Sequence, residues 1–141
     1  MSREQEVLAA TRRFYEALEA LMAGRGLEPM VAAWHHLPTV SSAHPMGDWA
    51  HGWEEVRATW EIFGPIGRPE LAGSKIRDLR AHVVGDLAYV TGVFITTPAF
   101  GSIELAITNV LQFADGAWKI VHHHADKAPG LAKGLEKLAA D

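Results

Sequence analysis

The spacing of hydrophobic residues changes once along this chain, near residue 73, and that change limits the folds open to it. Before residue 73, apolar residues recur every three or four positions, as they do on one face of a helix. After it, apolar and polar residues alternate, which is typical of strands. We therefore predict an α+β fold in which helices come first and cover one face of an antiparallel sheet.

The alternating half of the chain divides into four predicted strands joined by short turns. Gly85-Asp86 and Asp115-Gly116 are two-residue turns of the kind that close β-hairpins, whereas the link over Pro98–Ser102 is longer. The predicted strands are Lys75–Val84, Leu87–Thr97, Ile103–Ala114 and Ala117–Ala125.

Three helices are predicted in the first half. Ser2 and Gln5 fit a capping box, so the first helix begins there and ends at Gly24 and Gly26. A second, shorter helix carries Pro29 in its first turn and is stopped by Pro38, and a third starts near Trp53. Between the last two, Thr39–His44 is predicted as a short strand and the segment from His44 to Gly52 as a loop.

Length and composition exclude several classes of protein. The 141 residues suit one domain over residues 1–141, with a tail over 126–141 that carries leucines at helical spacing. A net charge of −4 argues against a nucleic-acid surface. No apolar run is long enough to span a membrane, the charged amino terminus lacks the apolar core of a signal peptide, and there is no cysteine. A cytoplasmic protein is the expectation.

The last hairpin gives a register prediction for a run of three histidines. If Asp115-Gly116 is a two-residue turn, Asn109 faces His122 and Ile107 faces His124 on one face of the sheet, while His123 lies on the other face. The first face is apolar near the turn and becomes polar only at Asn109, His122 and His124. These groups are therefore either a satisfied structural cluster or the polar floor of a pocket.

The chain resembles a known family in several segments. The helix start Gly52–Val56, the hairpin segment Gly85–Val90 and the closing segment Asp115–His124 resemble the SnoaL-like branch of the nuclear-transport-factor-2-like superfamily. The resemblance implies a cone-shaped, cystatin-like fold in which three N-terminal helices pack on a curved antiparallel sheet around an internal site. Members include ketosteroid isomerase, scytalone dehydratase, polyketide cyclases and non-catalytic association domains. Many are homodimers through the outer face of the sheet.

The preferred hypothesis is acid/base catalysis, without a cofactor, on a small hydrophobic substrate, as in an isomerase, cyclase or dehydratase. A histidine near its working pKa can take or give a proton. The expected catalytic residues are His122, oriented by Asn109, with Asp48 and with Tyr15, which the resemblance places inside the cone. The expected substrate-binding residues are Trp34, His44, Trp49, Trp53, His124 and Ile107, whereas Trp60 and Trp118 are expected to be core.

Two other hypotheses stay open at this level. The pocket could bind a ligand without turnover, or the chain could be a dimeric association domain. His122 and His124 could also chelate a metal, with His44 or His51 as a third ligand, but this needs a ligand from a loop of unknown position.

Overall fold

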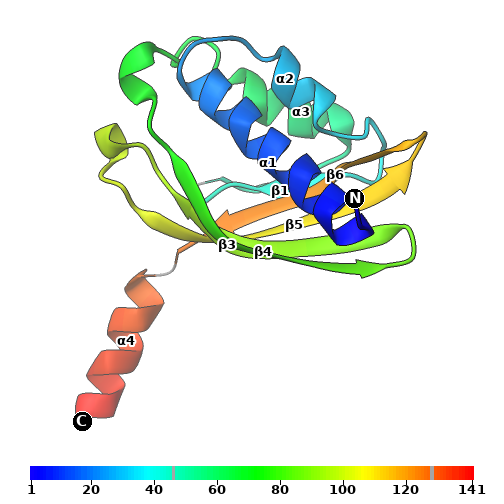
Figure 1. The fold of residues 1–141 in the computed structure, drawn as a ribbon. Coiled ribbons are helices and arrows are strands. Elements are labelled where there is room, and N and C mark those ends of the chain that lie inside the picture. Colours follow the sequence, from blue (N-terminus) through cyan, green and yellow to red (C-terminus); the bar gives the residue numbers. More distant parts are fainter. Residues whose placement is uncertain (46, 128) are drawn as a thin grey trace.

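The computed structural model describes residues 1–45, 47–127 and 129–141, and it is a layer of helices packed on one face of a curved sheet (Figure 1). The sheet has six strands in the order β2-β1-β6-β5-β4-β3. The helices are α1 (Arg3–Met22), α2 (Glu28–Ala32), α3 (Trp53–Glu61) and α4 (Pro129–Ala140). The strands are β1 (Ser41–Ala43), β2 (Trp49–His51), β3 (Lys75–Val84), β4 (Leu87–Ile95), β5 (Glu104–Ala114) and β6 (Ala117–Asp126).

Helix α1 is the central element of the core. It begins with the predicted capping box, in which the Ser2 hydroxyl accepts from the Gln5 amide and the Gln5 side chain accepts from the Ser2 amide. Its buried face lies on the concave side of the sheet, with Val7 and Phe14 fully buried (Figure 1). This burial of a long apolar stripe, rather than helix propensity, supplies most of the stability of such a helix.

Two predictions for the segment between α1 and α3 were incomplete. Helix α2 ends at Ala32, because Trp34 leaves the helix to form a bridge with Ile120 of β6. The segment predicted as a loop contains strand β2, which pairs with β1 in an antiparallel hairpin. Strand β1 runs parallel to β6, so the sheet is antiparallel except at this pair.

The four long strands and both two-residue hairpin turns are confirmed. Val84 pairs with Leu87 across the first turn, and Ala114 pairs with Ala117 across the last. A 3₁₀ helix over Pro98–Phe100 occupies the longer link between β4 and β5. The alternation of polar and apolar residues therefore identified these elements correctly.

Two β-bulges bend the sheet. In β3 the pairing shifts between Arg77 and Arg80, where Asp78 has a φ of 59° and the facing residue is Gly92. In β6 the pairing shifts after Ile120, so that Val121 has no partner on β5 and His122 pairs with Val110. An extra residue of this kind turns every later side chain of the strand to the opposite face.

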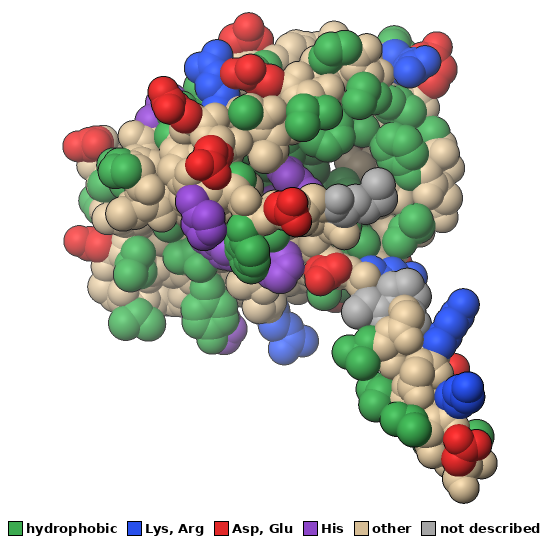
Figure 2. All heavy atoms as spheres, turned by 180° about the vertical axis from the view of Figure 1, so that it is seen from behind, with side chains coloured by type: hydrophobic (Ala, Val, Ile, Leu, Met, Phe, Trp, Pro, Cys, Tyr) green, Lys and Arg blue, Asp and Glu red, His purple; other side chains and the backbone are tan. Residues whose placement is uncertain are grey.

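Helix α4 extends away from the rest of the chain (Figure 1). Its leucines at 131, 135 and 138 are between 59% and 72% exposed, and Figure 2 shows hydrophobic side chains on one side of this helix and basic ones on the other. Among the described residues, no helix has the length and apolar character needed to cross a membrane.

Candidate functional site

The bulge at Val121 reverses the predicted orientation of the three histidines. Asn109 pairs with His123, not with His122, and His123 is the imidazole that lies buried on the inner face. His122 and His124 are only partly buried and lie on the outer face with Thr108 and Val110. The prediction that His122 and His124 share the inner face with Asn109 is therefore wrong, because simple hairpin arithmetic takes no account of the bulge.

Three polar side chains form a connected network on the inner wall. Asn109, fully buried, donates from Nδ2 to the Tyr15 hydroxyl at 2.9 Å. Its Oδ1 atom lies 2.6 Å from Nδ1 of His123. Because the amide oxygen can only accept, Nδ1 of His123 carries the proton. The Nε2 atom of neutral His123 is thus an unprotonated acceptor, and it meets no hydrogen-bond partner among the described residues.

Burial fixes the protonation of both ends of this network. Burial, and after it the nearby His44, lowers the pKa of His123 well below its ordinary value, so this imidazole is neutral at pH 7. Burial raises the pKa of Tyr15, and the hydrogen bond from Asn109 opposes this only in part. Tyr15 therefore keeps its proton, and that proton is free to be donated because the hydroxyl oxygen only accepts from Asn109.

A second imidazole, His44, lies near His123. The two ring centres are 5.9 Å apart, and the His44 ring meets the Trp60 ring edge to face at 4.5 Å. The Thr59 hydroxyl donates to the carbonyl of Val56 at 2.6 Å, so it accepts from Nε2 of His44 at 3.0 Å. The proton of neutral His44 is therefore on Nε2. Burial lowers the pKa of His44 as well.

These groups border a largely apolar cavity of about 520 Å³ between α1 and the sheet. This volume is ordinary for a small-molecule site. Tyr15, His44 and His123 are among its polar lining residues, with Ser74, Thr96 and Thr97, while Trp60, Phe94 and Ile107 are among its apolar walls. Figure 2 shows a hollow bordered by hydrophobic side chains on one face of the molecule. Polar groups at the edge of an apolar cavity can orient a ligand and exchange a proton with it.

The structure brings together some of the predicted site residues. Tyr15, His44 and Ile107 line the cavity, and Asn109 forms one hydrogen bond with Tyr15 and one with His123. Asp48 is exposed and is not part of the lining.

None of the three tryptophans predicted as stacking walls lines the cavity. Trp34 is buried in the core, 6.1 Å from Trp53 between ring centres, and Trp53 stacks on His36 at 4.1 Å. Trp60, expected to be core, is buried and also lines the cavity. Trp60 stands four residues before the Gly64-Pro65 break at the end of the third helix, and nothing in this position indicates that its ring lines the cavity. Trp118 is core, as expected.

The outward histidines form a separate cluster around Trp49, which is 54% exposed. The Trp49 ring centre lies 5.8 Å from His122 and 5.4 Å from His124, and Ser41 bonds to Nδ1 of His122 at 2.8 Å. Histidine and hydrophobic side chains gather on the face seen in Figure 2. Within the described residues, no group of three or more His, Asp or Glu side chains is placed to hold a metal ion, so the chelate of His122 and His124 is not completed.

Comparisons with known proteins support the fold. A sequence model of the SnoaL-like domain family matches residues 7–126. The F-box protein SKIP8 of Arabidopsis thaliana is 27% identical over 104 residues, which are 72% of this chain and 42% of the plant protein. The chain thus spans less than half the length of that relative.

Similar solved structures also support the fold. A provisionally named calcium/calmodulin-dependent protein kinase type II association domain from Thiobacillus denitrificans is 26% identical, with a TM-score of 0.71 over 86% of this chain and 94% of that one. A provisionally named dehydratase of the nuclear-transport-factor-2-like family from Streptomyces avermitilis is 22% identical, with a TM-score of 0.67 over 88% and 94%. The fold predicted from the sequence is confirmed, and at these identities the structural likeness of the dehydratase concerns the fold alone.

Proposed function

Because the chain belongs to the SnoaL-like domain family, we propose that its cavity binds a small, largely apolar molecule and catalyses acid/base chemistry on it without a cofactor. The observation that carries the proposal is the network His123–Asn109–Tyr15 on the wall of an apolar cavity of about 520 Å³. His123, whose Nε2 atom is unprotonated, and Tyr15, which keeps its hydroxyl proton, both line this cavity. In this geometry His123, rather than His122, is the base.

The reaction class that fits best is proton abstraction next to a carbonyl, as in an isomerisation. Nε2 of His123 takes the proton from the α-carbon, and the electron pair of the broken C–H bond forms the new C=C bond. The carbonyl oxygen becomes an enolate oxygen, which the Tyr15 hydroxyl stabilises by donating a hydrogen bond. Asn109 accepts from Nδ1 of His123 throughout and is a positioning residue. The same base then returns the proton to a different carbon.

Hydrogen exchange into a generic ketone tests this proposal without a known substrate. 2-Tetralone in deuterated water should lose its α-proton signals faster with the protein than without it. Exchange should fall by about 10²-fold or more in His123→Gln, the low end of what a positioned base contributes. His82→Gln, on the exposed outer face, serves as the control.

Binding is measured in parallel with the uncharged fluorophore N-phenyl-1-naphthylamine. Binding that survives in His123→Gln together with lost exchange supports catalysis. Binding by the natural chain with no exchange above the buffer rate overturns it and leaves a binding protein.

We also propose that two copies pair through the outer face of the sheet. Leu87 and Tyr89 of β4 are 51% and 45% exposed there, and Val110 of β5 lies between Tyr89 and His122 of the Trp49 cluster. Apolar side chains gathered on one exposed face are typical of an interface. Light scattering should give twice the chain mass, and Tyr89→Glu should return it to that of one chain. A natural chain of single mass at micromolar concentration overturns this proposal.

A further inference from the structure

The outer face of the sheet, which α1 to α3 leave uncovered (Figure 1), carries one row of side chains that crosses all six strands. Residues that pair across neighbouring strands lie side by side on the same face. The strand pairing therefore defines the members of the row, which are His82, Tyr89, Val110, His122, Ser41 and His51. We call it the histidine row.

No side chain of the histidine row carries a permanent charge, although charged residues make up 21% of the chain. Three of its six side chains are imidazoles, which are neutral above about pH 6.5 and cationic below it in an ordinary setting. His122 lies in the middle of the Trp49 cluster, with ring centres 5.8 Å from Trp49 and 6.5 Å from His124 of the next row. The row is thus uncharged at pH 7.5 and gains positive charge in mild acid.

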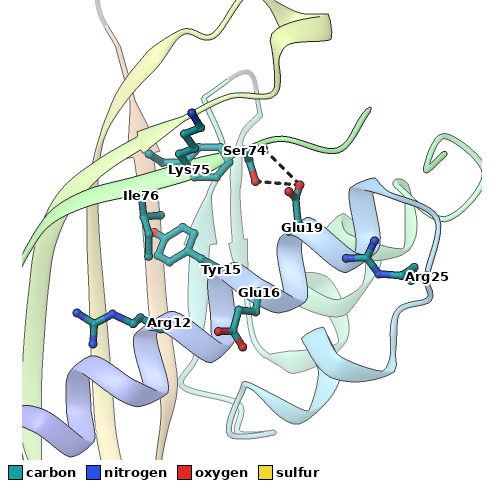
Figure 3. Close-up of a pocket in the computed structure, with 9 residues that line it drawn as sticks. Arg12, Tyr15, Glu16, Glu19, Arg25, Ser74, Lys75 and Ile76 are labelled. Carbon is teal, nitrogen blue, oxygen red and sulfur yellow. Dashed lines mark hydrogen bonds between the residues drawn. The ribbon is translucent and has the colours of Figure 1, made fainter. Parts of the chain in front are cut away.

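The charged side chains near this face lie outside the histidine row. Beside the imidazoles, the Asp126 carboxylate lies 3.9 Å from Nε2 of His124, and Glu55 of α3 accepts from the His51 amide at 3.0 Å. Lys75 points to the outer face at the start of β3, whereas Ile76 points toward α1 (Figure 3). The other charged groups on or beside this face are Arg80, Lys119, Asp48 and Arg77 with its ion-pair partners Asp78 and Glu104.

The His122 ring is held by a neutral partner. Its Nδ1 atom bonds to the Ser41 hydroxyl at 2.8 Å, and it forms no ion pair with a described carboxylate. A proton added to this ring therefore brings a charge that no described side chain neutralises. Burial, and after it the neighbouring His124, already lowers the pKa of His122 in a single copy.

A two-fold pair places this face against the same face of a second copy. Stacked sheets lie about 10 Å apart, which is about one Debye length at physiological salt. Neutral imidazoles and aromatic rings can pack across such an interface. Cationic imidazoles lose water there and repel the cations of the other copy, so pairing lowers their pKa further.

We propose that pH controls the pairing of two copies through this face, and that protonation of His122 and its neighbours His51 and His124 separates them. This inference rests on the pairing proposed above and adds how it is regulated. Because a paired copy binds these protons less readily than a single copy, the dissociation constant rises as the pH falls below about 6.5. The rise is about tenfold per pH unit for each imidazole that stays neutral only in the pair.

The charge of the whole chain favours the opposite trend. The net charge of −4 approaches zero as histidines gain protons, and the general repulsion between copies then weakens. The sign of the pH effect on the dissociation constant therefore distinguishes control by the outer-face histidines from an effect of net charge.

Sedimentation equilibrium at pH 7.5 and 5.5, at one ionic strength, tests the inference. The dissociation constant of the natural chain should rise tenfold or more between these pH values, and the rise should be smaller in His122→Gln. His122→Arg places a permanent charge in the row and should separate the copies at pH 7.5. His36→Arg adds the same charge at an exposed position that stacks on Trp53, away from the outer face, and it should stay paired.

The outcomes separate this inference from the pairing itself. A dissociation constant that is equal at both pH values or falls in acid overturns the inference while the pairing stands. So does a His122→Arg chain that pairs as tightly as His36→Arg, and this comparison decides the matter at pH 7.5 if circular dichroism shows unfolding at pH 5.5. A natural chain of single mass at both pH values is a failure of the proposed pairing, and the inference fails with it.

Discussion

His123 differs from its two histidine neighbours in its burial and in its hydrogen-bond partner. It is buried, it has a hydrogen bond from Nδ1 to Asn109, and its pKa is lowered well below the ordinary value. His122 is partly buried and bonds to Ser41 on the outer face. Because neighbouring side chains of a strand point to opposite faces, a shift of one residue in the register decides which imidazole lines the cavity and which lies on the outer face.

The tautomer of His123 is a direct prediction of the network. Asn109 accepts from Nδ1, so the neutral ring should carry its proton on Nδ1 and not on Nε2. Long-range proton–nitrogen NMR spectra distinguish the two forms, because the protonated and unprotonated nitrogens resonate far apart. A proton found on Nε2 would mean that the Asn109 amide is turned around, and His123 would then lack a free base nitrogen.

The lowered pKa of His123 predicts a stability that depends on pH. Above about pH 6.5 the ring is neutral in both the folded and the unfolded chain, so it contributes nothing to the pH dependence. Below that pH, His123 binds a proton in the unfolded chain but not in the folded chain. The free energy of unfolding should therefore fall by up to about 1.4 kcal/mol per pH unit. The free energy of unfolding stops falling once the pH reaches the pKa of His123 in the folded chain. His44 acts in the same direction.

Urea unfolding between pH 7.5 and 5 measures this slope. His123→Gln should reduce it, because glutamine does not titrate, whereas His82→Gln should leave it as it is. An unchanged slope in His123→Gln would contradict the claim that the lowered pKa of His123 causes the pH dependence.

The elements of this fold follow from sequence more reliably than their register does. The capping box, the change of period and the two hairpin turns identify α1 and β3 to β6 because each is a local signal. Short β2 has only three residues and no alternation long enough to detect.

The bulge of β6 was missed for a different reason. It falls between Ile120, which bridges to Trp34, and His122–His124, which pair with β1. The change of neighbouring strand is a tertiary event, and neither glycine nor proline marks it in the sequence. Because three histidines follow one another, either register places an imidazole on the inner face. The sequence therefore predicts a histidine near Asn109 but not which one.

The bend of β3 gives a prediction at the scale of the element. A methyl group on Gly92 would lie 2.7 Å from Cδ2 of Leu79 and 3.2 Å from the carbonyl oxygen of Arg77. Gly92→Ala should thus destabilise the chain by about 1–3 kcal/mol, the usual effect of overpacking, as measured by urea unfolding.

A glycine of α4 is the matched control. A methyl group on Gly134 would meet no atom within 4 Å, so Gly134→Ala should preserve stability and raise helix content slightly. A Gly92→Ala chain as stable as the natural one would mean that β3 and β4 do not approach closely at the bulge.

Viewed as a whole, the molecule consists of a cone that holds the site and a helix that stands apart from it. The family match ends at residue 126, and the leucines of α4 remain largely exposed. A chain that stops at Lys127 should therefore keep its fold, with a melting temperature within a few degrees of the natural one, since few buried contacts are lost. A large drop in melting temperature would show that α4 packs on the cone or on a second copy in solution.

The central claim is that His123 and His44 face a ligand cavity while His122 and His124 face outward. Histidine ring signals recorded by NMR during addition of N-phenyl-1-naphthylamine test it most directly. We predict that the ring signals of His123 and His44 shift in proportion to bound ligand, whereas those of His122 and His124 stay in place. Shifts at His122 and His124, with His123 unchanged, would contradict the account.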